Sequence, residues 1–87
     1  MAIDYSKLRN LSAAKLSRAL ERDGFDFVRQ RASHRRYHHP DGRRVTVVFP
    51  RPGYTYRPKT LKSIIETQAK WTEADLKRLK LLPKYDP

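Results

Sequence analysis

The chain has 87 residues, which suits one small domain and lies near the lower limit for a protein that buries a core without covalent or metal support. It contains no cysteine, so disulfide bridges, thiolate zinc sites and cysteine nucleophiles are excluded, and a reducing cytoplasm is the expected location. No apolar run approaches the ~18 residues of a spanning helix, and the first ten residues lack the apolar core of a signal peptide, so we expect a soluble, unsecreted protein without membrane contact.

Basic residues dominate the charge, since 20 lysines and arginines stand against nine acids and give a formal net charge of +11. Ten of the basic residues and a single acid, Asp41, fall within residues 29–62. A charge excess that served solubility alone would be spread over the surface, whereas a cluster attracts a polyanion and gains affinity by releasing counterions. The sequence therefore favours a nucleic-acid surface in the middle third of the chain over a merely solvated basic surface.

The first predicted element is a helix over residues 11–24. Ser12 suits its N-cap, apolar residues then recur at helical spacing, and Gly24 stands where a left-handed residue would close the C-terminus. A β-strand is predicted next, over residues 25–31, because it begins with phenylalanines at alternate positions and continues with a β-prone valine.

A β-hairpin is predicted for residues 33–49, with its turn at residues 40–42. Proline presets one backbone angle of that turn, and glycine accepts the conformation that closes a tight loop. Apolar residues alternate along the second arm and should face the core. If Tyr37 also points inward, three residues of the first arm point outward together: His34, Arg36 and His38.

Residues 50–58 are predicted to form an exposed loop, because they hold three prolines and one glycine. Tyr54 and Tyr56 in this loop could stack on unpaired bases, and they could equally cover the edge of the sheet. The loop is therefore either a binding element or a structural one.

Two helices are predicted in the remaining chain. Thr60 can cap the first, and Thr72 with Asp75 resembles the capping-box start of a short second helix that ends at Pro83. The order helix, strand, strand, strand, helix with a short helical tail predicts an α+β fold, in which helices cover one face of a three-stranded antiparallel sheet. The apolar residues of the tail are expected to pack under the helices: Trp71, Leu76 and Leu79.

Histidines are the candidate acid–base groups, because their side chains gain and lose protons near neutral pH. All three histidines, His34, His38 and His39, lie in the basic third of the chain. Carboxylates are not clustered, so a two-metal nuclease is not expected. His38 and His39 are adjacent on a strand and point to opposite faces, and no further ligand stands at suitable spacing, so no metal site is predicted.

Several short motifs occur here in an order that is more specific than any one of them. They are Gly24-Phe25, Arg29-Gln30-Arg31-Ala32-Ser33-His34, Tyr37, His39-Pro40-Asp41-Gly42, Arg44-Val45-Thr46-Val47 and Thr60-Leu61-Lys62-Ser63-Ile64-Ile65. In this combination the chain resembles the HicA toxin family, also called YcfA-like, over about residues 12–70. We accordingly expect residues 1–87 to form a single HicA-like domain with a helical tail at 71–87.

The resemblance implies a fold like that of double-stranded-RNA-binding domains. It also implies a metal-independent endoribonuclease that cuts messenger RNA without a cofactor and is silenced by a HicB-type antitoxin. The family's catalytic histidine belongs to a Gly-Ser-His triplet, which here reads Ala32-Ser33-His34 and assigns catalysis to His34. Alanine at the first position matters if the backbone there needs a positive φ. The residues expected to contact RNA are Arg29, Arg31, Ser33, Arg35, Arg36, Arg43, Arg44, Lys59 and Lys62.

A metal-free mechanism is chemically possible because RNA carries its own nucleophile, the 2′-hydroxyl group. The protein needs only to orient that group, move one proton and stabilise the charge on phosphate. His34 is expected to act as the base, with arginines on the phosphate and a 2′,3′-cyclic phosphate and a 5′-hydroxyl as products. Two alternatives are a non-catalytic module that grips duplex RNA and a DNA-contacting or structural partner protein.

Overall fold

Ser12 begins the first helix, α1 (Ala13–Arg22), in a computed structural model that describes residues 3–82. Its side chain accepts a hydrogen bond from the backbone N–H of Lys15, which satisfies a donor that the helix start leaves free. Beyond the helix Gly24 has a left-handed φ of 96°, and a Cβ there would lie 2.9 Å from Nε2 of His39. The predicted helix and its two end signals are confirmed.

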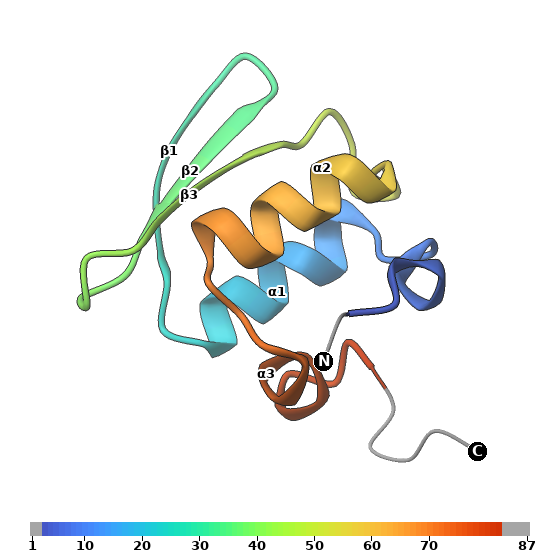
Figure 1. The fold of residues 1–87 in the computed structure, drawn as a ribbon. Helices are drawn as coiled ribbons and strands as arrows, with labels where there is room; N and C mark the ends of the chain where they lie inside the picture. Colours follow the sequence, from blue (N-terminus) through green and yellow to red (C-terminus); the bar gives the residue numbers. More distant parts are fainter. Residues whose placement is uncertain (1–2, 83–87) are drawn as a thin grey trace.

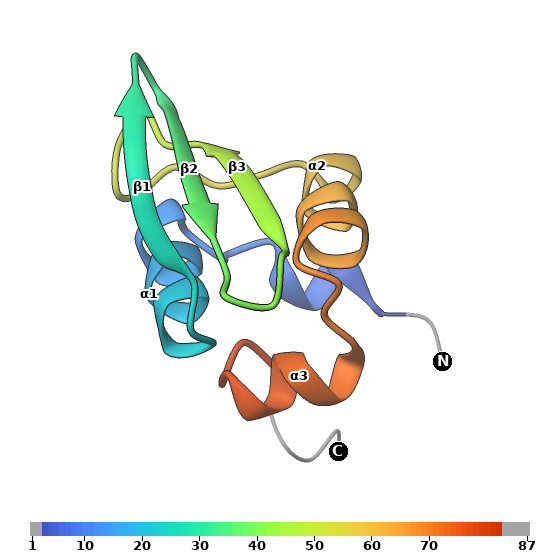
Figure 2. The same ribbon diagram turned by 90° about the vertical axis from the view of Figure 1, so that its left-hand side faces the viewer.

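Three antiparallel strands follow in the spatial order of the chain: β1 (Asp26–Arg31), β2 (His34–His38) and β3 (Arg44–Val48). The tight turn between β2 and β3 is closed by a hydrogen bond of 2.9 Å from the N–H of Gly42 to the carbonyl of His39. The helices lie on one side of the sheet, and the other side is open (Figure 1 and Figure 2). The predicted α+β fold is confirmed, with the layering of a double-stranded-RNA-binding domain.

The second helix, α2 (Pro58–Lys62), begins before the predicted start. Pro58 takes the first helical position, where its fixed φ suits the helix and its missing N–H leaves no bond unmade. Thr60 as the N-cap is therefore wrong, since Arg57 occupies that place without a side-chain bond. The helix continues as the π-helical segment η2 (Ser63–Gln68).

A short helix, α3 (Glu73–Arg78), closes the described chain. Thr72 and Asp75 form the predicted capping box, each side chain bonding the backbone N–H of the other residue. The helix ends at Arg78, earlier than the predicted end at Pro83, which lies outside the described residues. Within residues 3–82 no helix has the length and apolar character that crossing a membrane requires.

The loop that follows β3 is only partly exposed, which corrects the prediction for residues 50–58. Tyr56 is 6% exposed, and its hydroxyl donates a hydrogen bond of 2.5 Å to the carbonyl of Val48. The carbonyl of Tyr54 accepts from the N–H of Ala13 at 2.7 Å, so the loop also holds the start of α1. Tyr56 therefore covers the sheet edge, and its ring is not available to stack on a base.

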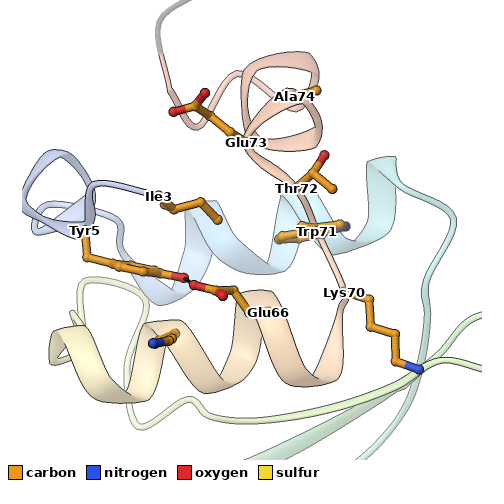
Figure 3. A pocket seen from close by; sticks show the side chains of 9 residues that line it. Ile3, Tyr5, Glu66, Lys70, Trp71, Thr72, Glu73 and Ala74 are labelled. Carbon is orange, nitrogen blue, oxygen red and sulfur yellow. Dashed lines mark hydrogen bonds between the residues drawn. The ribbon is translucent and has the colours of Figure 1, made fainter. Parts of the chain in front are cut away.

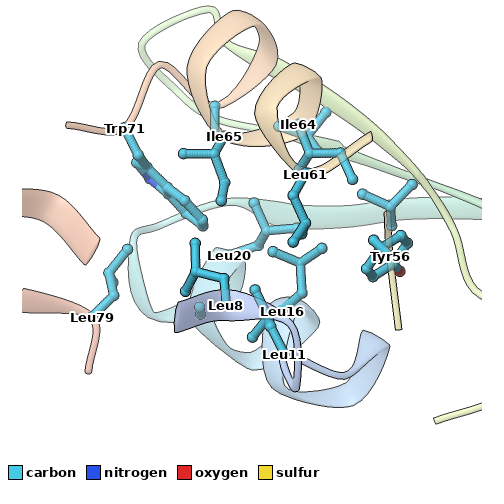
Figure 4. Packing of buried hydrophobic residues seen from close by; sticks show 14 of the residues in the cluster. Leu8, Leu11, Leu16, Leu20, Tyr56, Leu61, Ile64, Ile65, Trp71 and Leu79 are labelled. Carbon is cyan, nitrogen blue, oxygen red and sulfur yellow. The ribbon is translucent and has the colours of Figure 1, made fainter. Parts of the chain in front are cut away.

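One apolar core joins the two layers (Figure 4). A short 3₁₀ helix that the sequence analysis did not predict, η1 (Tyr5–Leu8), adds Leu8 to this core. Tyr37 is fully buried, and its hydroxyl forms a hydrogen bond with the buried Ser17, which satisfies both polar groups. The expected packing of the tail is confirmed, because its apolar side chains are at most 3% exposed: Trp71, Leu76 and Leu79.

Asp23 joins four parts of the chain at one end of the sheet. Its carboxylate accepts hydrogen bonds of 2.8 Å from both the indole N–H of Trp71 and the guanidinium of Arg78, and it lies 3.2 Å from the guanidinium of Arg43. Its backbone carbonyl accepts a bond of 2.7 Å from Nε2 of His39. Burial alone would raise the pKa of Asp23, but these hydrogen bonds and charges outweigh it and hold the pKa below its usual range.

Asp23→Asn should lower the free energy of unfolding at neutral pH by about 1.5–3 kcal/mol, because charge-assisted hydrogen bonds are lost. Since the folded-state pKa lies below the unfolded value of about 3.9, the contribution is present at neutral pH and is lost as the pH falls through the folded-state pKa. In urea melts, the gap between wild type and variant should therefore shrink as the pH falls below the unfolded-state value of about 3.9. Asp26→Asn, at an exposed position, is the control and should change stability by less than about 0.5 kcal/mol.

Candidate nucleic-acid interface

The open face of the sheet carries three rows of side chains that run across the strands. Residues opposite each other in antiparallel strands point to the same face, so the strand register defines the rows. From the β1–β2 turn outward the rows are Arg31, His34 and Val48; Arg29, Arg36 and Thr46; and Asp26, His38 and Arg44. The prediction that His34, Arg36 and His38 point outward together is confirmed, because Tyr37 between them is buried in the core.

A hollow of about 400 Å³ lies around His34 at the turn end of this face. No acidic residue lines it, so its charge is set by arginine side chains that favour an anion. The lining residues are Arg29, Arg31, Ala32, His34, Arg36 and Thr46. Sequence reasoning missed Thr46, although it stands at an outward position of the alternating strand β3.

Arg29 and Arg36 stand directly opposite each other in the sheet. Like charges at such a position destabilise an antiparallel pair. Both side chains are exposed, and neither forms an ion pair within residues 3–82. The pair therefore adds nothing to folding, and a bound anion would relieve its repulsion.

His34 is the first residue of β2 and directly follows the two-residue loop Ala32-Ser33. Ala32 has φ 53°, in the left-handed region that glycine occupies most easily. Alanine thus adopts the conformation in which the family's glycine would be unstrained. With alanine at this position the turn still forms, and His34 still pairs with Arg31 and Val48.

Two of the predicted RNA contacts lie elsewhere. Arg35 points to the helix side of the sheet, where its guanidinium lies 3.6 Å from the ring centroid of Phe49. Arg43 bonds the carbonyl of Ala69 at 2.6 Å and the carboxylate of Asp41 at 2.7 Å. Both arginines therefore have structural partners within the fold.

The remaining predicted contacts are divided between the face and other elements. Arg44 lies on the open face in the third row, and Ser33 is in the loop before His34, half-buried. Lys59 and Lys62 are exposed on α2 and do not line the hollow. The structure thus brings Arg29, Arg31 and Arg36 together with His34.

The other two histidines differ from His34 in their surroundings. Both ring nitrogens of His39 are engaged, because Nε2 donates to the carbonyl of Asp23 and Nδ1 accepts from the N–H of Asp41 at 3.1 Å. His38 shares the open face, but its Nε2 is buried without a hydrogen-bond partner among the described residues. Across residues 3–82 no three His, Asp or Glu side chains are grouped so as to hold a metal ion.

A larger hollow, of about 720 Å³, lies between η1, η2 and the start of α3 (Figure 3). Tyr5 crosses it and donates a hydrogen bond to Glu66, and burial together with this bond raises the pKa of Tyr5. Lysines and glutamates line it together, without a histidine, and it shares no residue with the hollow around His34. The predicted site residues are thus divided, because His34 and three of the arginines line the smaller hollow, whereas Lys62 lines the larger one.

The fold and the site define a small α+β protein with a basic, open sheet face around one exposed histidine. Residues 13–71 match the family described as HicA toxin of bacterial toxin–antitoxin, and the chain belongs to this family. The resemblance seen in the motifs is thereby confirmed, and family membership implies an antitoxin partner. No curated protein matches the chain.

Arg36→Gln should raise the free energy of unfolding by about 0.2–1 kcal/mol, because it removes the repulsion with Arg29. It should also weaken RNA binding and reduce the slope of log affinity against log salt by about one. Arg18→Gln removes the same charge from an exposed position of α1 and should change neither quantity beyond error. Equal effects of the two variants, in urea melts and fluorescence anisotropy, would show that only net charge matters.

Ala32→Gly should raise the free energy of unfolding by up to about 1 kcal/mol. The left-handed conformation of Ala32 costs an L-residue about 1–2 kcal/mol, and glycine relieves this strain. The larger backbone entropy that glycine loses on folding takes back about 0.5–1 kcal/mol. Ala32→Val should act in the opposite direction, because a β-branched residue fits positive φ poorly. Thermal unfolding of the three proteins checks the order, and a more stable valine variant would contradict the strain.

Proposed function

We propose that the protein is an mRNA interferase, a metal-independent endoribonuclease that acts in the cytoplasm and uses His34 as its single acid–base group. The observation that carries the proposal is the hollow in which His34 meets Arg29, Arg31 and Arg36. A proton-transfer group and fixed positive charges are the two things that RNA cleavage by its own 2′-hydroxyl requires. Family membership supports the same assignment.

In the proposed reaction His34 accepts the proton of the 2′-hydroxyl as its oxygen attacks the adjacent phosphorus. The new bond joins the 2′-oxygen to phosphorus, and the bond between phosphorus and the 5′-oxygen breaks. The leaving oxygen takes a proton from water, so the products are a 2′,3′-cyclic phosphate and a 5′-hydroxyl. The protein's imidazole, the RNA and one water molecule account for every bond made and broken, so no step calls on a metal ion.

The arginines of the hollow are suited to hold the phosphate while negative charge builds on its nonbridging oxygens. Arg31 stands opposite His34 in the same row, and Arg36 occupies the next row of β2. A guanidinium keeps its charge throughout and can donate two parallel hydrogen bonds to one phosphate. Arg44, in the third row, would extend the contact along the RNA backbone.

We further propose a HicB-type protein as the antitoxin, acting by covering this face. Acidic side chains would neutralise the arginines and block access of RNA to His34 at the same time. Among the described residues Phe27 and Val28 are the large apolar side chains left exposed. Phe27 lies on the helix side of the sheet with its partner Tyr37, so only Val28, the extra residue of the β1 bulge, would add apolar contact area to such an interface.

Incubation with a defined messenger RNA in excess EDTA tests the activity. Wild type should yield cyclic-phosphate ends, and His34→Ala should cut more slowly by about 10²–10⁴-fold while keeping its fold and its affinity for RNA. An RNA with a single 2′-deoxynucleotide at the cleavage site is the substrate control and should stay intact. RNA that is bound by both proteins and cut by neither would refute the nuclease and leave the double-stranded-RNA-binding module.

A further inference from the structure

We infer that Gln30 is a positioning residue for His34, acting with Arg35 and Phe49 as a clamp on the far side of the sheet. This inference rests on the proposed function of His34. The three residues are called the hairpin clamp below. None of them lines the hollow, so the clamp acts only through the backbone of the loop Ala32-Ser33.

The loop needs outside support because of where it lies. The end of the β1–β2 hairpin projects beyond the helices, so no helix packs beneath it (Figure 1). Ala32 holds a left-handed φ that alanine does not favour by itself. A loop of this kind, left without partners, would sample other conformations and carry His34 with it.

The hairpin clamp supplies that support through both carbonyls of the loop. The side-chain amide of Gln30 donates to the carbonyl of Ala32 at 3.0 Å. The N–H of Phe49, just past the end of β3, donates to the carbonyl of Ser33 at 2.5 Å. The two residues that precede His34 are thus fixed to β1 on one side and to the chain after β3 on the other.

Gln30 is itself held in one orientation. Its amide oxygen accepts a hydrogen bond of 2.8 Å from Nε of Arg35, which leaves the NH₂ group to face the carbonyl of Ala32. A flipped amide would set donor against donor and acceptor against acceptor, so only one orientation satisfies both contacts. The guanidinium of Arg35 is in turn stacked 3.6 Å from the ring centroid of Phe49, which is 9% exposed, and 5.5 Å from that of Phe27.

The consequence for catalysis is geometric. Proton transfer needs the imidazole within hydrogen-bond reach of the 2′-hydroxyl, and a displacement of about 1 Å can cost about 10²-fold in rate. Loss of the clamp should therefore lower kcat and leave KM nearly unchanged, because the arginines that bind RNA stand on the other face. A purely structural role would lower the folded fraction and would not separate the two constants.

The test uses Gln30→Met, which keeps the length of the side chain and removes both hydrogen bonds. We expect kcat for RNA cleavage to fall at least about tenfold and KM to stay within about threefold. Gln30→Glu keeps the acceptor for Arg35 but turns a carboxylate toward the carbonyl of Ala32, so it should lose kcat in the same way. Gln68→Met makes the same change where the amide bonds only the N–H of Thr46, and kcat should stay within about threefold of wild type.

Backbone ¹⁵N relaxation of residues 32–34 without RNA tests, independently of activity, whether Gln30 holds the loop in one conformation. Order parameters should fall from about 0.85 to below about 0.6 in Gln30→Met and stay high in Gln68→Met. A loop that stays rigid in Gln30→Met, or a kcat equal to that of wild type, would overturn the clamp. If wild type leaves RNA intact, the proposed function fails, and the relaxation data still decide whether Gln30 fixes the loop.

Discussion

The carboxylate of Asp23 is the contact on which the arrangement of the two layers depends. It ends α1, and within 3.2 Å it meets Arg43 of the β2–β3 turn, Trp71 after η2 and Arg78 of α3. These partners are far apart in the sequence, so one carboxylate adds polar contacts between α1, the β2–β3 turn and the short C-terminal helix, whose Leu76 also packs into the core. The bonds to Arg43 and Trp71 are weakly screened because these side chains are largely buried, whereas the bond to Arg78, whose side chain is 52% exposed, is screened more strongly.

The arginines fall into two groups, those that bond other parts of the fold and those that lie on the open face. Arg35, Arg43 and Arg78 face an aromatic ring, a carbonyl or a carboxylate inside the fold. The arginines of the open face form no ion pair within the described chain: Arg29, Arg31, Arg36 and Arg44. A charge excess of +11 therefore separates into a part that the fold uses and a part left for a partner. Composition alone does not show this division, because it depends on which face of a strand each arginine occupies.

Much of the fold could be predicted from local signals. Ser12, Gly24 and the Pro-Asp-Gly turn fix element ends through their own backbone chemistry, and the alternation along β3 fixes which face is buried. The start of α2 was missed because Pro58 determines it, although Thr60 matches a cap pattern. η1 was missed because four residues are too few to show helical spacing; its local signal is Asp4, whose side chain accepts a hydrogen bond from the N–H of Ser6, and the packing of Leu8 against distant residues supplies the rest.

The candidate site was predictable in part. Which residues of β2 point outward follows from the alternation along the strand. The proposal that His34 is the acid–base residue came from the family resemblance. The bulge between Phe27 and Arg29 sets which residues of β1 share the open face, and no periodicity reveals it. Arg35 and Arg43 were assigned to RNA because they lie in a basic run, whereas contacts with Phe49 and Ala69 determine their positions.

The contacts of Asp23 and the candidate site around His34 lie at opposite ends of the sheet. β2 runs from His34 to His38, and the next residue, His39, bonds Asp23, so the two ends are about 16 Å apart at the usual rise per residue of a strand. The Asp23 end lies near α1 and α3, whereas the His34 end projects beyond the helices with like charges facing each other (Figure 2). Local opening should therefore begin at the His34 end, where the apolar contacts are fewest. A polyanion on this face would reduce the repulsion and stabilise the hairpin against local opening, so binding and local stability are coupled at the same residues.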